Sequence, residues 1–219
     1  MEKEENLGAT NPAVSNDELL EINFLLEFIK MFVLLKLKKT INNFKPDFLF
    51  HLAAQPLIYY SYSNPYNTLD INIRGTLNVL ESVRKNKFVK SLIIVTSDKC
   101  YESNNSTKGF KENDRLGGID PYSASKASAE ITARAYRKSF FNSKKRILGI
   151  STARAGNVIG GGDWGKHRIV PDIIRSIYKN EIPVIRNPSH TRPWLYILDV
   201  IEGYLLLAER LYNKKQPTE

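Results

Sequence analysis

Short apolar runs alternate with longer segments of helical spacing along this chain. Residues 47–54 (DFLFHLAA), 89–98 (VKSLIIVTSD) and 146–154 (RILGISTAR) are largely apolar, which is typical of strands buried inside a sheet. A shorter run at 182–187 (IPVIRN) predicts a further strand. Each run is followed by a longer segment, as strand–helix alternation requires.

The longer segments predict helices. Residues 120–141 open on Asp-Pro, a common helix start, and the apolar positions of 67–86 recur at helical spacing. Similar patterns predict helices at 34–44, 168–180 and 198–214. Strands that alternate with long helices pair in parallel through right-handed crossovers. The expected fold class is α/β, a doubly wound, Rossmann-like parallel sheet.

Residues 19–37 form the one stretch that suggests a membrane. A spanning helix needs about 20 apolar residues with few charges. This stretch contains Glu21, Glu27, Lys30 and Lys36, so it predicts a buried or amphipathic helix and no membrane partner.

The composition fits a soluble globular protein in a reducing compartment. The chain has 219 residues, enough for one domain with a small lobe, and 42% of them are hydrophobic, which argues against disorder. Cys100 is the single cysteine, so an internal disulfide is excluded. The N-terminus is polar and acidic, unlike a secretory signal, and a cytoplasmic location is expected.

The net charge of +9 leaves two kinds of partner open. Nucleic-acid binding requires basic residues gathered on one face or stripe. Here the Lys and Arg residues are scattered, which favours a basic surface around a small phosphorylated ligand over nucleic acid. His51, His167 and His190 lack metal-ligand spacing, and no metal site is expected.

A hydroxyl, an acid and a lysine stand together where the second strand ends. Ser97, Asp98 and Lys99 directly follow the run LIIVT. In open α/β sheets, ligands bind at the carboxyl ends of strands. The stretch is therefore either a solvated charged turn or part of an active site.

Tyr122 and Lys126 form a Y-x-x-x-K pair at the start of a predicted helix. Four residues apart, they lie on one helix face, where the ammonium would lower the pKa of the phenol and suit it to act as a general base. Any surface helix can carry such a pair by chance. Ser97 gives it context, since its hydroxyl could share a proton with Tyr122.

These motifs together resemble the extended short-chain dehydrogenase/reductases that act on nucleotide sugars. More narrowly, the resemblance is to the CDP-glucose 4,6-dehydratases, and it runs from about Lys45 to the C-terminus. The blocks that carry it are HLAAQPLI, VTSDKCYE, DPYSASKASAE, ARAGNVIGGGDW and RNPSHTRPWLYILD. The Asp98–Lys99 pair and the GGGDW loop favour this group, because the dTDP-glucose relatives carry Asp-Glu at the pair.

The resemblance implies a lyase that uses bound NAD to remove water from CDP-glucose and give CDP-4-keto-6-deoxyglucose. Tyr122 would take the proton of the sugar 4-hydroxyl while hydride leaves C4, and Ser97 would hydrogen-bond the same oxygen. Lys126 would lower the pKa of Tyr122 and hold the nicotinamide ribose. Lys99 would remove the C5 proton, Asp98 would protonate the departing 6-hydroxyl, and hydride would return to C6.

The resemblance also implies binding residues, each with a structural alternative. The cofactor side comprises Ala53, Ala54, Asn72, Thr96, Tyr122 and Lys126, and the substrate side comprises Gln55, Asn157, Arg186 and Arg192. The alanines could simply pack in the sheet, Asn72 could be a structural amide, and an Arg beside Pro193 could pack on the surface. Gly160 to Gly162 would form a mobile loop over the sugar, or an ordinary turn.

Relatives of this family begin with a strand and a G-x-x-G-x-x-G loop for the NAD pyrophosphate. The 46 residues before DFLF contain one glycine, Gly8, so a truncated chain with little activity is expected. We expect residues 1–17 to be foreign to the family and disordered, 18–155 to be a partial dinucleotide-binding core, and 156–219 a partial substrate-binding region with a final helix.

Two other functions remain open. One is an NAD-dependent sugar-nucleotide epimerase or reductase, although an epimerase needs no C5 base beside an acid. The other is a fragment that binds a nucleotide sugar and catalyses nothing. The family pattern also implies a homodimer through a four-helix interface made by the helix at 67–86 and the Tyr122 helix.

Overall fold

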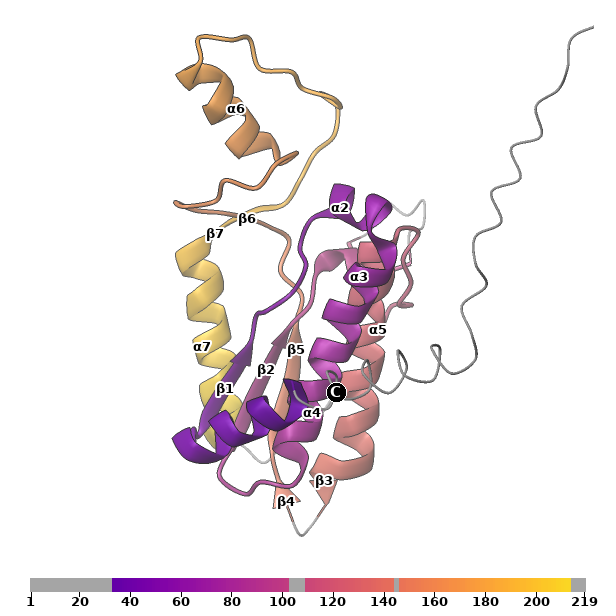
Figure 1. Ribbon diagram of the computed structural model, residues 1–219, viewed down its shortest axis with the longest axis vertical. Coiled ribbons are helices and arrows are strands. Elements are labelled where there is room, and N and C mark those ends of the chain that lie inside the picture. The colour runs from indigo at the N-terminus through magenta and orange to yellow at the C-terminus, as the bar shows by residue number, and fades with distance from the viewer. Residues whose placement is uncertain (1–32, 103–108, 144–145, 214–219) are drawn as a thin grey trace, which may run out of the picture.

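The computed structural model describes residues 33–102, 109–143 and 146–213 (Figure 1). The expected segment 1–17 and most of the stretch 19–37 lie outside these residues, whereas 33–44 form a helix. No helix within the described ranges has the length and apolar character needed to cross a membrane.

A parallel sheet lies at the centre of the fold. Its strands are β1 (Phe48–His51), β2 (Ser91–Val95) and β5 (Gly149–Ala153), in the order β1-β2-β5. Both pairings are parallel, with Leu49 opposite Leu92 and Leu92 opposite Ile150. The three apolar runs are therefore neighbouring parallel strands, as the sequence predicts, and their carboxyl ends share one edge.

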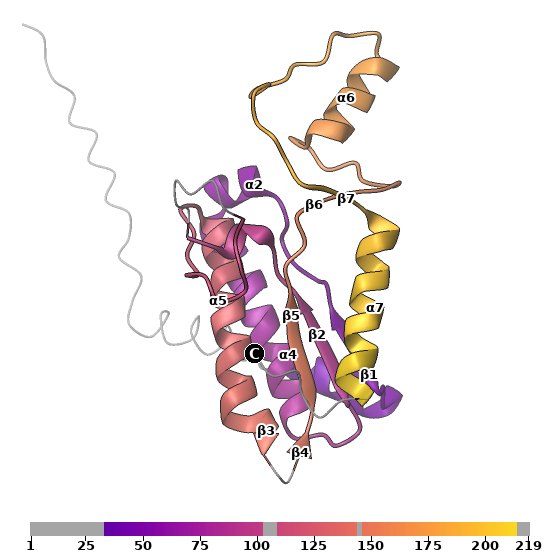
Figure 2. The ribbon, with the colours of Figure 1, turned by 180° about the vertical axis from the view of Figure 1, so that it is seen from behind.

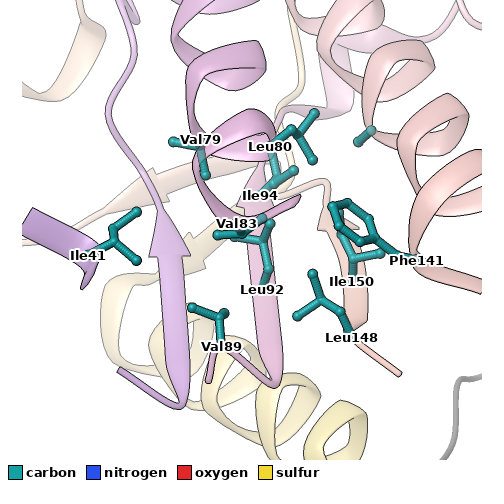
Figure 3. Packing of buried hydrophobic residues seen from close by; sticks show 11 residues of the cluster. Ile41, Val79, Leu80, Val83, Val89, Leu92, Ile94, Phe141, Leu148 and Ile150 are labelled. Carbon is teal, nitrogen blue, oxygen red and sulfur yellow. The ribbon is translucent and has the colours of Figure 1, made fainter. Parts of the chain in front are cut away.

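Strand β2 is apolar at successive positions because both faces of the sheet are covered. Leu92 and Ile94 pack into the larger core cluster on one face, which also contains Leu80, Val83, Phe141 and Ile150 (Figure 3). Ile93 faces the opposite side and packs against Ala208 and Leu211. The two-residue period of a strand sends neighbouring side chains to opposite faces.

Helices cover both faces of the sheet. On one face lie α4 (Gly75–Arg84) and α5 (Pro121–Tyr136), and on the other lies α7 (Ile197–Asn213) (Figures 1 and 2). The helix expected at 67–86 is continuous from α3 (Pro65–Leu69) through a π-helical turn, η1 (Asp70–Arg74), into α4. The remaining elements of the core are α2 (Ile58–Ser63), the short turn η2 (Asp98–Cys100), the π-helical turn η3 (Arg137–Phe141), β3 (Asn142–Ser143) and β4 (Arg146–Ile147).

A lobe of less regular structure extends beyond the carboxyl edge of the sheet (Figures 1 and 2). It contains β6 (Asn157–Ile159), β7 (Trp194–Tyr196) and α6 (Ile169–Tyr178), and β6 pairs in parallel with β7. The prediction of a strand at 182–187 is wrong. Ile182 and Val184 are 90% and 84% exposed in an irregular segment, and the partner of β6 comes from residues 194–196 instead. An apolar run forms a strand only where a neighbouring strand can pair with its backbone.

Candidate active site

The residues that follow β2 form a short turn at the carboxyl edge of the sheet. Ser97 is extended and caps η2, since its Oγ accepts a hydrogen bond from the Lys99 backbone N–H at 3.2 Å. The Asp98 N–H donates to the Ala155 carbonyl at 3.1 Å, which ties the turn to the end of β5. The sequence TSDK therefore folds back at the edge where ligands of α/β sheets bind.

Helix α5 begins beside this turn. Asp120 caps it by accepting from the Ser123 N–H at 2.9 Å, and Pro121 occupies the first helical position. Gly118 passes so close that a Cβ there would lie 2.4 Å from the Ala124 nitrogen. These features fix the first turn of α5 and hence the position of Tyr122.

The Tyr122 phenol lies near the Ser97 hydroxyl, which lowers the pKa of the phenol. Both residues are buried, with 9% and 7% of their surfaces exposed. Burial raises the pKa of the Tyr122 phenol, and the Ser97 hydroxyl only partly offsets that effect. That Tyr122 and Ser97 share a proton stays a prediction.

Lys126 is buried on the same helix, one turn after Tyr122. Its Nζ donates to the Val95 carbonyl at 3.2 Å, and burial lowers its pKa to about 8, opposed by the charge of Glu130. That Lys126 lowers the pKa of Tyr122 stays a prediction. Burial dominates at Tyr122 and raises its pKa, while the ammonium is directed to the end of β2.

Asp98 and Lys99 form an ion pair. The Lys99 Nζ lies 2.8 Å from Asp98 Oδ2, and the two side chains are 33% and 28% exposed. The Ser97 Oγ donates to the other carboxylate oxygen, Oδ1, at 3.2 Å. Ser97 thus bonds to Asp98 and lies near Tyr122, which brings the Y-x-x-x-K helix close to the acid–lysine pair.

Asn72 and Gln55 form a buried clamp between β1 and the helices. The Asn72 Oδ1 accepts from the Gln55 N–H at 2.8 Å, and its Nδ2 donates to the Gln55 carbonyl and to Ser125 Oγ. The Gln55 Nε2 donates to Thr68 Oγ1 at 2.8 Å, and its Oε1 accepts from the Leu57 N–H. Both side chains point into the protein, so this geometry favours the structural alternative over direct ligand contact.

The other cofactor-side residues lie at the same edge. Ala53 is exposed and Ala54 half-buried in the connection between β1 and α2. Thr96 is buried, and its hydroxyl donates to the Glu130 carboxylate, while its backbone N–H donates to the Ala153 carbonyl at 2.9 Å. The Thr96 hydroxyl therefore bonds to a buried carboxylate inside the protein.

The substrate-side residues belong to the lobe. Asn157 begins β6, and its N–H donates to the Pro193 carbonyl at 3.0 Å. Arg186 donates to the His167 carbonyl at 2.9 Å and lies over the Tyr59 ring, 4.7 Å from its centroid. Arg192 is exposed and donates to the Thr191 carbonyl at 3.2 Å. Across the described residues, no hydrogen bond or ion pair links either arginine to the Ser97–Tyr122 pair.

The glycine-rich segment of the lobe is a turn. Gly162 has a φ of +81°, a conformation that favours glycine, and Gly161 has open space around it. Its closure over a sugar stays a prediction.

A sequence model of the NAD dependent epimerase/dehydratase family matches residues 9–219. The chain belongs to this family. The match begins upstream of Lys45, where the quoted motifs start.

Relatives within the epimerase/dehydratase family include several sugar-nucleotide dehydratases. The chain is 46% identical over 182 residues to the CDP-glucose 4,6-dehydratase of Salmonella typhimurium, covering 82% of this chain and 51% of the relative. It is 30% identical over 177 residues to the dTDP-D-glucose 4,6-dehydratase of Dictyostelium discoideum, covering 76% and 39%. The chain thus spans about half or less of the length of these relatives.

Solved structures of the epimerase/dehydratase family have the same fold. The UDP-N-acetylglucosamine 4-epimerase of Methanobrevibacter ruminantium matches with a TM-score of 0.69 and 26% identity, covering 79% of this chain and 54% of that one. The dTDP-glucose 4,6-dehydratase DesIV of Streptomyces venezuelae, solved with NAD bound, matches with a TM-score of 0.70 and 22% identity, covering 80% and 51%. The second likeness shows the fold alone.

Three charged or titratable residues at this site had no role in the sequence analysis. Glu130 and Arg154 form a buried ion pair at 2.7 Å beneath the turn η2. His51 ends β1, where burial and the charge of Lys126 lower its pKa to about 4. Glu130 could have been noticed from sequence, because it lies four residues after Lys126 on the same helix face.

Proposed function

We propose that this chain carries the catalytic residues of a CDP-glucose 4,6-dehydratase, a lyase that forms CDP-4-keto-6-deoxyglucose with NAD as bound cofactor. One observation carries the proposal: Ser97 lies near Tyr122 and bonds to Asp98, the ion-pair partner of Lys99. The residues proposed for oxidation, Ser97 and Tyr122, and those proposed for elimination, Asp98 and Lys99, would then contact the same sugar. The identity of 46% to a CDP-glucose 4,6-dehydratase supports the choice of substrate.

The residues at the edge of the sheet fit a nicotinamide cofactor. Lys126 is a buried ammonium with three N–H donors, and one acceptor, the Val95 carbonyl, is its hydrogen-bond partner among the described residues. Its remaining donors are suited to ribose hydroxyls. Ala53 and Ala54 are small side chains after β1, so a ring can approach the backbone there. NAD, when bound, would supply a hydride acceptor for C4 and return the hydride to C6.

Each proton would be handled by a separate side chain. Tyr122 Oη would take the proton of the sugar 4-hydroxyl, with Ser97 Oγ hydrogen-bonded to the same oxygen. The resulting 4-ketone makes the C5 proton acidic, since the electron pair delocalises as an enolate. Lys99 Nζ would remove that proton, and Asp98 would protonate the C6 oxygen as the C–O bond breaks and water leaves.

The lobe would bind the nucleotide diphosphate. Asn157, Arg186 and Arg192 are its candidate contacts, because guanidinium groups bind phosphate oxygens through two parallel hydrogen bonds. We propose that residues 18–155 hold the dinucleotide and 156–219 the sugar nucleotide. Arg186 would have to exchange its hydrogen bond to the His167 carbonyl for phosphate oxygens. Gln55 would act through the Asn72 clamp that shapes the loop after β1.

The decisive experiment measures exchange of the C5 proton with deuterated solvent. NAD and CDP-glucose are added to stoichiometric protein, and the 4-keto-6-deoxy product is quantified in parallel. Lys99→Met should slow C5 exchange by about 10²- to 10⁴-fold, the usual contribution of one positioned acid or base. Lys111→Met, which changes an exposed lysine, serves as the matched control. Exchange in Lys99→Met at the parent rate, or a parent chain that does not bind CDP-glucose, would contradict the proposal.

We further propose a cytoplasmic homodimer formed through α4 and α5. These helices lie side by side on one face of the sheet, and Leu77 and Ile131 on them are 37% and 48% exposed (Figures 1 and 2). Two such pairs would form a four-helix interface. Light scattering should give twice the monomer mass for the parent, and Ile131→Glu should give the monomer mass. A monomeric parent would refute the interface.

A further inference from the structure

A carboxylate is fully enclosed behind the catalytic helix. The Glu130 side chain is 4% exposed, and three groups donate to it: Thr96 Oγ1, Thr152 Oγ1 at 2.7 Å and Arg154 Nη2 at 2.7 Å. These partners come from the ends of β2 and β5, the two strands that α5 crosses. Glu130 therefore joins the helix of Tyr122 and Lys126 to both strand ends.

The Arg154 guanidinium carries this connection on to the segment after η2. Its Nη1 donates to the Tyr101 hydroxyl at 2.9 Å and to the Glu112 carbonyl at 3.0 Å. Its plane also lies over the Tyr101 ring, 4.9 Å from the centroid, and that ring stacks on Phe110 at 4.6 Å. Arg154 thus bonds to α5 through Nη2, and it bonds to residues beyond Lys99 through Nη1.

Backbone contacts also hold the turn that carries Asp98 and Lys99, including a β-bridge between Tyr101 and Leu116. Backbone bonds hold it at the Ala155 carbonyl, and the Cys100 carbonyl accepts from the Gly117 N–H at 2.9 Å. Tyr101 directly follows the turn, so the contacts that orient its ring act two residues from Lys99. The Arg154 guanidinium is therefore positioned to hold the Asp98–Lys99 pair in a fixed place relative to Tyr122.

We propose that the Glu130–Arg154–Tyr101 chain is a positioning device that holds the Asp98–Lys99 turn against the Tyr122 helix. This inference rests on the proposed function for its catalytic meaning. A buried ion pair is weak evidence of stabilisation, because the desolvation of both charges opposes their attraction. A planar guanidinium with directed N–H groups, however, fixes the mutual orientation of the groups that it bridges.

Cys100 offers a direct measure of the turn. It is the single cysteine of the chain, lies between Lys99 and Tyr101, and is 0% exposed. Alkylation of its thiol requires the turn to open, so the labelling rate reports the open population. The urea dependence of that rate separates local opening, which is nearly independent of urea, from global unfolding, which depends on it steeply.

Three variants of the 219-residue chain test the device. Arg154→Lys keeps a cation beside Glu130 but cannot bridge it to Tyr101, and labelling should accelerate about 10-fold with little urea dependence. Tyr101→Phe keeps the ring and loses one hydrogen bond, for an expected increase of about 3- to 10-fold. Arg154→Met leaves Glu130 without its cation and should label fastest. Arg84→Met removes an arginine ion-paired with Glu81 elsewhere on the surface and should leave the rate unchanged.

The proposal is overturned if the Cys100 thiol is alkylated at the parent rate in both Arg154→Lys and Tyr101→Phe. It is equally overturned if every acceleration follows the steep urea dependence of global unfolding, because Arg154 would then only stabilise the fold. Labelling needs neither NAD nor a sugar nucleotide. A failure of this experiment therefore leaves the proposed function standing, and a failure of C5 exchange leaves the labelling result standing.

Discussion

The ammonium of Lys99 lies 2.8 Å from the carboxylate of Asp98, its neighbour in sequence. In this ion pair, the proton that could pass between the two groups is on the Lys99 nitrogen. Moving that proton to the carboxylate would give a neutral amine beside a neutral acid, the base and acid that the proposed elimination requires. Elimination by that neutral pair would return the ion pair, because the amine would gain the C5 proton and the carboxyl group would give its own to the leaving oxygen.

Asp98→Asn should separate the two halves of the elimination. The amide cannot donate a proton to the C6 oxygen, so product formation should fall by about 10²- to 10⁴-fold. Exchange at C5 should fall by less than product formation, because Lys99 remains but can no longer pass its proton to Asp98. The measurement is the ratio of deuterium incorporated at C5 to product formed. Asp47→Asn, which breaks an exposed pair with Lys90, is the control. Equal loss of exchange and product would show that Asp98 does not act as the acid.

Tyr122→Phe should block oxidation at C4 while leaving the fold nearly intact. The variant loses only the phenol hydroxyl near Ser97, and Ser97 keeps its bonds to Asp98 and the Lys99 N–H. We expect the unfolding free energy to change by about 1 kcal/mol or less. Reduced nicotinamide, followed by its absorbance in a single turnover, should not accumulate. Accumulation at the parent rate would exclude Tyr122 as the base.

Gly118→Ala should displace the first turn of α5. The added Cβ would lie 2.4 Å from the Ala124 nitrogen and 2.5 Å from the Ser123 carbonyl carbon, and backbone cannot move aside cheaply. We expect a loss of about 1–3 kcal/mol in urea unfolding. Gly75→Ala is the matched control with the opposite sign. Its Cβ meets nothing within 4 Å at the start of α4, so it should stabilise by about 0.5–1 kcal/mol. Equal effects of the two variants would mean that the space at Gly118 is not limiting.

His51 should make the protein sensitive to acid. Burial and the charge of Lys126 lower its pKa from 6.5 to about 4, and its Nε2 lies 3.3 Å from Thr76 Oγ1. At a pH between these two pKa values, His51 is protonated in the unfolded chain but not in the folded chain. The stability from His51 is therefore complete above about pH 6.5 and is lost as pH falls toward 4, on the order of 3 kcal/mol in all. His51→Asn should flatten the curve of unfolding free energy against pH over that window. A parallel curve for the variant would refute the assignment.

Asn72→Ala should loosen the connection between β1 and α5. It leaves the Gln55 backbone N–H and carbonyl and the Ser125 hydroxyl without their partner in a buried site. The expected loss is about 2–4 kcal/mol in denaturant unfolding, because unsatisfied buried polar groups lose their hydration as well. Asn67→Ala removes an exposed amide that bonds to Tyr60 and should change stability by less than about 0.5 kcal/mol. Similar losses for both variants would contradict the clamp.

The sequence by itself determined the strands of the central sheet, the main helices around it and their order. Continuous apolar runs predicted β1, β2 and β5, and the Asp-Pro start predicted α5, because burial on both sheet faces and helix capping act on neighbouring residues. Tyr122 and Ser97 were also predicted to meet, since a strand end and the next helix start share the carboxyl edge of a parallel sheet. The strand at 182–187 failed because local apolarity does not tell which segment lies beside β6.

Only the tertiary structure decided the environment of each charge. Lys126 is directed to the Val95 carbonyl, Asn72 is bonded to Gln55 and Ser125, and Glu130 meets Arg154 across 24 positions of sequence. Helical spacing places Lys126 on the face of Tyr122, but the pKa values of both depend on the residues that enclose them from β1, β2 and β5. Electrostatic energies vary with distance and burial between segments that are remote in sequence, and those distances exist only once the chain has folded.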